Sequence, residues 1–261
     1  MGQKPDRDPT PEARAGVSLK KQTKPMKNHH QHLRYHRMDR WLARGAVLLI
    51  VALQLGFVND LSVGPWWLAP SIEFALLIPL SLGTIWTERS VRTAESNQEW
   101  LLVRNRRRNV RLLAIVLTAF STIINFVALA LLIQAIIAGH AGTGRALLID
   151  AINIWATNVV VFALWFWFLD RGGPSSRGIV PDHQRDFLFT QQQKGPRTDG
   201  FSEWLPGFID YLFLAYTNAT AFSPADTFPL TVRVKLLMMA ESAISLVTIA
   251  VVASRAVGIL S

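Results

Sequence analysis

The chain has 261 residues, of which half are apolar and 17% are charged, whereas about 25% of the residues of ordinary soluble domains are charged. Lysine and arginine outnumber aspartate and glutamate by 27 to 18, which gives a formal net charge of +9 at pH 7. The absence of cysteine excludes disulfide bonds, thiolate nucleophiles and metal sites with cysteine ligands. Long runs with few charges alternate with short arginine-rich stretches, a pattern that predicts a multi-pass membrane protein.

Residues 1–40 are polar and rich in proline, lysine and glutamine, a composition that predicts a disordered basic arm. We expect its charges to fix the membrane topology and to contact anionic lipids. The arm contains four histidines, of which His32 and His36 would share one face of a helix. The surrounding charged residues are mostly basic and repel cations, so we favour a solvated tail over a metal site.

A bilayer core about 30 Å thick requires about 20 mostly apolar residues in a helix. Five runs of the sequence satisfy this requirement, at residues 41–58, 66–86, 112–138, 146–169 and 232–258. A sixth run, 205–222, is weaker because it contains Asp210 and Asn218, and it either crosses the bilayer or enters and returns. The predicted fold is an all-α polytopic helix bundle with six transmembrane helices, or with five and a re-entrant half-helix.

The basic residues of the connecting segments predict the orientation, because loops rich in lysine and arginine stay in the cytoplasm. If all six runs cross, the successive segments outside the bilayer contain 11, 0, 7, 1, 5 and 0 such residues. This alternation predicts a protein of the bacterial inner membrane with both termini in the cytoplasm. The predicted organisation is the arm, a four-helix region at 41–170, a flexible cytoplasmic loop at 171–204 and a hairpin at 205–261. Within the loop we expect the apolar residues 187–189 to rest on the membrane interface.

An ionised side chain at the centre of a bilayer costs about 2.5–3.5 kcal/mol on insertion scales, so each one needs a partner or a role. In the last predicted span, Glu241, Ser245, Thr248 and Arg255 fall near one line along the helix. No opposite charge lies close to Glu241 in the sequence, which makes it the leading candidate for a functional site.

Other polar residues of the predicted spans have competing interpretations. Glu73 in the second span either extends to the outer surface or has a function. Asp150 and Asn153 lie on one stripe of the fourth span, and the third span carries a similar stripe from Thr118 to Asn125. Small polar stripes of this kind more often join helices than line a pathway, so we favour a packing role for both.

Six residues near the carboxyl end have a distinctive spacing: Thr220, Asp226, Pro229, Lys235, Glu241 and Arg255. In this spacing, residues 211–258 resemble the pore helix and inner helix of bacterial potassium channels. The resemblance implies that Thr220 lies at the base of a filter and that Asp226 follows it. The whole chain also resembles a broad group of bacterial multi-pass membrane proteins that end in a similar hairpin, a likeness that implies no activity.

The filter itself departs from the channel pattern, because Ser223, Pro224 and Ala225 stand in place of Gly-Tyr-Gly. The potassium filter needs backbone conformations that glycine permits, whereas proline fixes φ near −65°. A potassium-selective filter is therefore not expected. The same residues instead predict the start of a helix, with Ser223 as the N-cap and Pro224 in the first helical position.

No motif for catalysis, for binding a cofactor or for binding nucleic acid is found in the sequence, so an enzyme is not expected. The preferred hypothesis is an oligomeric membrane protein whose carboxyl-terminal hairpin serves ion permeation or ion sensing. One alternative is a scaffold or assembly factor that does not conduct ions. A small-solute exporter is the other alternative, weakened by the absence of an internal repeat.

Overall fold

The structure is a computed structural model that describes residues 26–56, 97–139, 143–170, 185–192, 204–220 and 227–260, with Gly173 and scattered positions between residues 65 and 82. Its helices are α2 (Met26–Leu55), α4 (Asn97–Ile137), α5 (Gly144–Leu169), α6 (Phe208–Ala219) and α7 (Val232–Leu260). The remaining elements are strands β1 (Phe187–Phe189) and β2 (Thr227–Pro229) and the short helix η3 (Thr190–Gln192).

Three of the described helices are long and apolar enough to cross a membrane. The apolar segments are Arg108–Ile137 of α4, Gly144–Leu169 of α5 and Val232–Ser254 of α7, and a shorter one, Trp41–Leu55, belongs to α2. They coincide with four of the predicted spans, so the chain is mostly helical and has the helices of a membrane bundle, as the sequence predicts.

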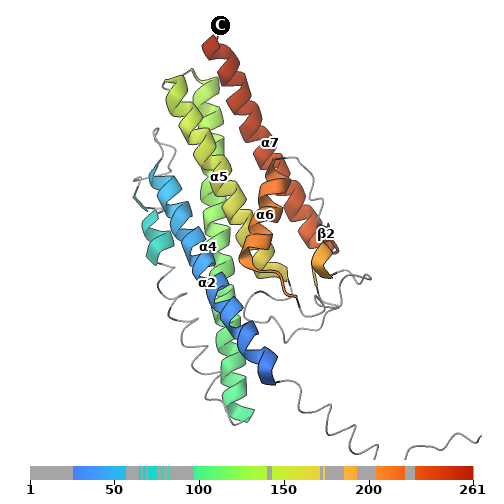
Figure 1. Ribbon diagram of the computed structural model, residues 1–261. Helices are drawn as coiled ribbons and strands as arrows, with labels where there is room; N and C mark the ends of the chain where they lie inside the picture. Colours follow the sequence, from blue (N-terminus) through green and yellow to red (C-terminus); the bar gives the residue numbers. More distant parts are fainter. Residues whose placement is uncertain are drawn as a thin grey trace, which may run out of the picture.

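Helix α5 is the centre of this bundle and packs against α2, α4, α6 and α7 (Figure 1). Its carboxyl-terminal half, from Thr157 to Phe168, is almost entirely buried. A helix that is apolar on all sides is stable only when every side is covered, by protein or by lipid. Helix α7 is the opposite case, since Leu236, Met239 and Leu246 are each more than half exposed along its outer surface.

Both α2 and α4 begin at the end of the bundle where α5 ends and α7 begins (Figure 1). The carboxyl ends of α2 and α7 and the turn between α4 and α5 lie at the opposite end (Figure 1). Helix α4 has 41 residues and is therefore about 62 Å long at 1.5 Å per residue. This length is about twice the thickness of a bilayer core, and the apolar segment Arg108–Ile137 accounts for only part of the helix.

Strands β1 and β2 form a two-stranded antiparallel sheet in which Phe187 pairs with Pro229 and Phe189 with Thr227. Side chains alternate along a strand, so Phe187 and Phe189 lie on one face of the sheet. Both are buried, and both rings meet the ring of Tyr211 edge to face. The expectation that these residues rest on the membrane interface within a flexible loop is therefore wrong, because their rings are part of the protein core.

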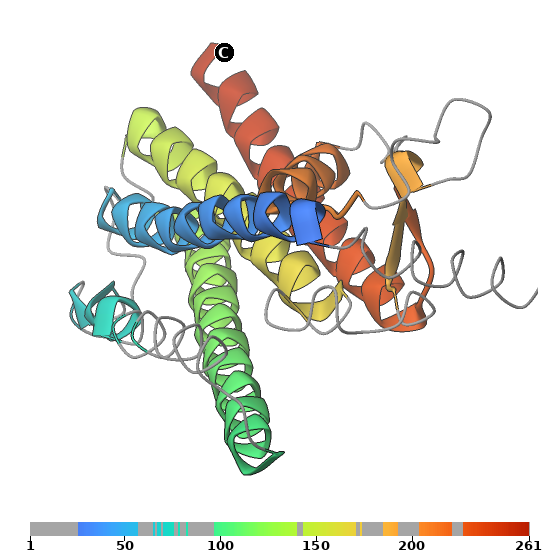
Figure 2. The ribbon, with the colours of Figure 1, turned by 60° about the horizontal axis from the view of Figure 1, so that its bottom comes forward.

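Helix α6 has 12 residues and is about 18 Å long, too short to cross a bilayer core of about 30 Å. The segments before and after it meet in the β1–β2 sheet, so the chain leaves α6 on the side from which it came. The six predicted crossings are therefore not confirmed, and the short α6 is compatible with the alternative prediction of five crossings and a re-entrant half-helix. The amino end of α2 and the carboxyl end of α7 lie at opposite ends of the bundle (Figures 1 and 2). That both termini are cytoplasmic stays a prediction.

One predicted boundary also differs from the structure. Helix α2 begins at Met26, so it includes residues 26–40 of the expected disordered arm, and residues 1–25 lie outside the described part of the chain. Helix α7 begins at Val232, as the predicted last span does, and residues 227–229 before it pair with β1. The predicted helix start at Ser223 lies outside the described residues. Residues 221–226, which include Asp226, lie outside the described residues.

Cysteine accessibility tests the re-entrant path, and the chain has no native cysteine to remove. The exposed positions Thr190 and Leu230 lie near the two strands, and exposed Ala138 follows α4. We expect Thr190→Cys and Leu230→Cys to react with a membrane-impermeant maleimide from one face of the membrane, and Ala138→Cys from the other. Labelling of Leu230→Cys together with Ala138→Cys, and not with Thr190→Cys, would support the six-crossing arrangement.

Candidate functional site

Glu241 lies in the third turn of α7, and its side chain is completely buried. The amide of Asn218, near the end of α6, donates hydrogen bonds to Glu241 Oε2 at 2.7 Å and to the Met238 carbonyl at 2.9 Å. Glu241 Oε1 has no hydrogen-bond partner among the described residues. The carboxyl group is therefore half satisfied, within a segment apolar enough to cross a membrane.

Helix α5 contributes Asn158 to the same place. Its amide donates to Ser245 Oγ at 2.9 Å and to the Glu241 carbonyl at 3.3 Å. Ser242 Oγ donates to the Asn218 carbonyl at 3.3 Å. Three helices thus share one set of polar contacts, which we name the Glu241 cluster and which consists of Asn158, Asn218, Glu241, Ser242 and Ser245.

The chemistry of the Glu241 cluster suits a small cation or a proton. Carboxylate, hydroxyl and amide oxygens are hard ligands, and Glu241 Oε1 is an acceptor without a donor. Among the described residues, no group of three histidine, cysteine, aspartate or glutamate side chains could hold a metal ion. The Glu241 cluster therefore offers one carboxyl group rather than the several acidic ligands of a calcium site.

Two other candidates of the last two helices, Thr248 and Thr220, hydrogen-bond to carbonyl groups of their own helices. Thr248 is fully buried on α7, and its hydroxyl donates to the Ile244 carbonyl at 2.8 Å. Thr220 ends α6 and donates to the Tyr216 carbonyl at 2.8 Å. Arg255 belongs to α7, but its side chain is outside the described part. Of the predicted line on α7, only Glu241 and Ser245 belong to the Glu241 cluster.

The candidates of the earlier spans lie elsewhere in the bundle. Asn153 of α5 donates to the Gly56 carbonyl at 3.1 Å and so joins α5 to the end of α2. Asp150 is fully buried one turn before it. On α4, Thr122 accepts a hydrogen bond from the Trp165 indole of α5 at 2.9 Å. One member of each predicted stripe thus makes a hydrogen bond to another helix, as a packing role would require.

Glu73 is fully buried and accepts a hydrogen bond from the Gln54 amide at 3.0 Å. It does not extend to the surface, so that interpretation of Glu73 is wrong.

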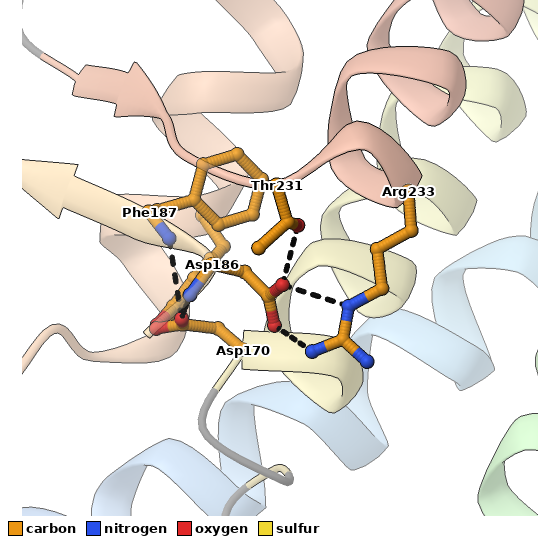
Figure 3. A network of polar contacts seen from close by, with 6 residues as sticks. Asp170, Asp186, Phe187, Thr231 and Arg233 are labelled. Carbon is orange, nitrogen blue, oxygen red and sulfur yellow. Dashed lines mark hydrogen bonds and ion pairs between the residues drawn. The ribbon is translucent and has the colours of Figure 1, made fainter. Parts of the chain in front are cut away.

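A second set of polar contacts, which the sequence analysis missed, lies where α5 ends and α7 begins (Figure 3). Asp170 Oδ1 accepts the backbone N–H groups of Asp186 at 2.7 Å and Phe187 at 3.3 Å, and its Oδ2 accepts the Tyr211 hydroxyl at 2.6 Å. Asp186 in turn accepts the Thr231 hydroxyl at 2.6 Å and Arg233 Nε at 2.7 Å, and it pairs with Arg233 Nη2. We name this set the Asp186 network; its members are Asp170, Asp186, Tyr211, Thr231 and Arg233.

Weak local signals account for the residues that the sequence analysis missed. Asn158 follows Thr157 and precedes a long apolar run on α5, so its amide is no stronger a signal than the Thr157 hydroxyl. Asp186 lies 47 residues before Arg233, and no pattern in the sequence links the two. The sequence does show an acidic residue directly before a short aromatic run, which is the one signal that could have pointed to Asp186.

No protein family, curated protein or solved structure matches the chain.

Two tyrosines of α6 provide a matched test of the Asp186 network. Tyr211 is fully buried and donates to Asp170, whereas Tyr216 is about half exposed on the same helix. We expect Tyr211→Phe to lower the free energy of unfolding by about 1.5–3 kcal/mol, the range for a hydrogen bond to a charged group. Tyr216→Phe should change it by less than about 0.5 kcal/mol. Denaturant or thermal unfolding in detergent measures both, and equal losses would show that the Tyr211 hydroxyl contributes nothing specific.

Proposed function

We propose that the chain is a multi-pass membrane protein that binds a small cation at the Glu241 cluster and uses the α6–α7 hairpin for ion sensing or ion permeation. The observation that supports this proposal is the fully buried Glu241, of which one oxygen accepts from Asn218 and the other has no partner among the described residues. A carboxyl group in this position is costly unless a cation or a proton neutralises it.

The distribution of basic residues supports a cytoplasmic location for the end of the bundle where α2 and α4 begin. The first half of α2, the first third of α4 and the start of α7 together contain most of the lysines and arginines of the described helices. At the opposite end the helices contain Arg145 and Arg255. The positive-inside rule then orients α7 from the cytoplasm outward. In this orientation Arg233 and Lys235 lie on the cytoplasmic side, whereas six crossings would have placed them outside.

The order of elements in the hairpin supports a relation to channels in shape. A short helix, a return segment and a long apolar helix follow one another, as the resemblance to the pore helix and inner helix implies. In the proposed orientation, however, α6 enters from the cytoplasmic side, whereas the channel pore helix enters from outside. Together with Ser223-Pro224-Ala225 in place of the filter, this favours cation sensing over potassium-selective conduction.

Cation flux in liposomes tests the proposal. Purified wild-type protein should raise the flux of protons or alkali cations above that of empty vesicles, or bind them measurably if the hairpin only senses them. Glu241→Gln should weaken the flux or the binding about tenfold or more, because a contact with a charged group is worth about 1.5–3 kcal/mol.

Ser254→Ala is the matched control, since it removes an exposed hydroxyl from the same helix. Flux equal to that of empty vesicles, together with no binding that depends on Glu241, would contradict the proposal.

The second candidate function is a scaffold or assembly factor that does not conduct ions. The observation that favours it is that Asn158 and Asn218 each join α7 to another helix. Under this alternative, Glu241→Gln lowers the melting temperature in detergent and leaves flux and cation binding unchanged.

A further inference from the structure

A second buried carboxyl group lies apart from the Glu241 cluster, where α2, α4 and the helical residues 70–75 meet. Glu73 is fully buried, and Gln54 of α2 is 8% exposed. The Gln54 amide donates to Glu73 Oε1 at 3.0 Å. Ser121 of α4 also lies within hydrogen-bonding reach of the Glu73 carboxyl, but its hydroxyl donates to the Leu117 carbonyl at 3.2 Å.

The contact between Glu73 and Gln54 lacks one hydrogen-bond donor. Glu73 Oε2 and Gln54 Oε1 are both buried, and neither has a hydrogen-bond partner among the described residues. An ionised carboxylate oxygen and an amide oxygen can only accept hydrogen bonds. If Glu73 is ionised, Glu73 Oε2 and Gln54 Oε1 are therefore two acceptors without a donor. A protonated carboxyl group has one O–H donor and would supply the missing hydrogen.

We propose that Glu73 and Gln54 form a proton-binding site in which the protonated Glu73 Oε2 donates to Gln54 Oε1 while the Gln54 amide donates to Glu73 Oε1. The two planar groups then form a reciprocal pair of hydrogen bonds, as a carboxylic acid and an amide do. One proton then gives both of these oxygens a hydrogen bond.

A proton fits this site better than a metal cation does. Calcium takes about 6–8 oxygen ligands and magnesium about six, counting water, whereas the pair offers two free oxygens. Among the described residues, Gln54 and Ser121 are the only side chains within hydrogen-bonding reach of the Glu73 carboxyl, and neither carries a charge. Within the described residues no lysine, arginine or histidine is thus available to neutralise an ionised Glu73.

The proposed hydrogen bonds join the end of α2 to the helical residues 70–75. Gln54 lies in the last turn of α2, and Glu73 follows it by 19 residues. Loss of the proton would leave a buried charge and an unpaired amide oxygen at this contact, which is costly inside a bundle. The contact between α2 and residues 70–75 should therefore weaken at alkaline pH.

Infrared spectroscopy of the full-length protein in detergent or liposomes at neutral pH tests the proposal. The difference spectrum between wild type and Glu73→Gln should show loss of the C=O stretching band of a carboxylic acid. The same band should move to higher frequency in Gln54→Leu, which removes its hydrogen-bond partner, and should persist in Glu241→Gln. Loss of a carboxylate band in Glu73→Gln, with no acid band, would overturn the proposal.

The melting temperature gives an independent readout. Glutamine has one donor side and one acceptor side, as a protonated glutamate does, so Glu73→Gln should melt within a few degrees of wild type. Glu73→Leu, which retains no polar atom, should leave both groups of Gln54 unpaired and melt at a clearly lower temperature. A large loss in Glu73→Gln equal to that in Glu73→Leu would contradict the reciprocal pair. Neither measurement depends on Glu241, so this site and the proposed function can fail separately.

Discussion

The hydrogen bonds of Asp186 hold the end of α5 and the start of α7 together. Asp186 accepts from Thr231 and Arg233 at the start of α7, while its backbone N–H donates to Asp170 at the end of α5. A carboxylate at the amino end of a helix is also favoured by the helix dipole, by about 0.3–1 kcal/mol. Arg233 is more than half exposed, so its ion pair alone is worth little. The strength of the Asp186 network comes from the buried groups, which would be left unpaired without it.

This constraint explains why α6 is short and why Asn218 meets Glu241. With α5 and α7 held together at one end, the residues between them must leave and return on the same side. Near the beginning of α6, the Tyr211 hydroxyl donates a hydrogen bond to Asp170. Near the end of α6, the Asn218 amide donates to Glu241 of α7. The Asp186 network and the Glu241 cluster therefore fix the two ends of α6. A substitution in one set of contacts should alter the geometry of the other.

The sequence predicts the long apolar helices because their signal is local and depends on length and composition alone. It also singles out Glu241 and Ser245, since four-residue spacing on one helix is visible without a structure. The β1–β2 sheet could not be predicted, because Phe187 and Pro229 are far apart in the chain and each strand has three residues. The same limit applies to α6: residues 205–222 are apolar enough to predict a span, whereas the strand pairing on either side of α6 joins residues that are far apart in the chain. For Glu73, burial depends on Gln54 and on α4, neither of which the local sequence around Glu73 reveals.

A disulfide across the sheet tests the re-entrant path most directly. Leu188 and Phe228 lie opposite one another in the register of β1 and β2. Opposed Cα atoms in an antiparallel pair are about 4.5–5.5 Å apart, within the range of about 4.4–6.8 Å that a disulfide requires. The double variant Leu188→Cys/Phe228→Cys should form an intramolecular disulfide in native membranes after mild oxidation, seen as a gel shift that a reductant reverses. If both cysteines remain free while a maleimide labels them from opposite faces of the membrane, α6 crosses the bilayer and this account is wrong.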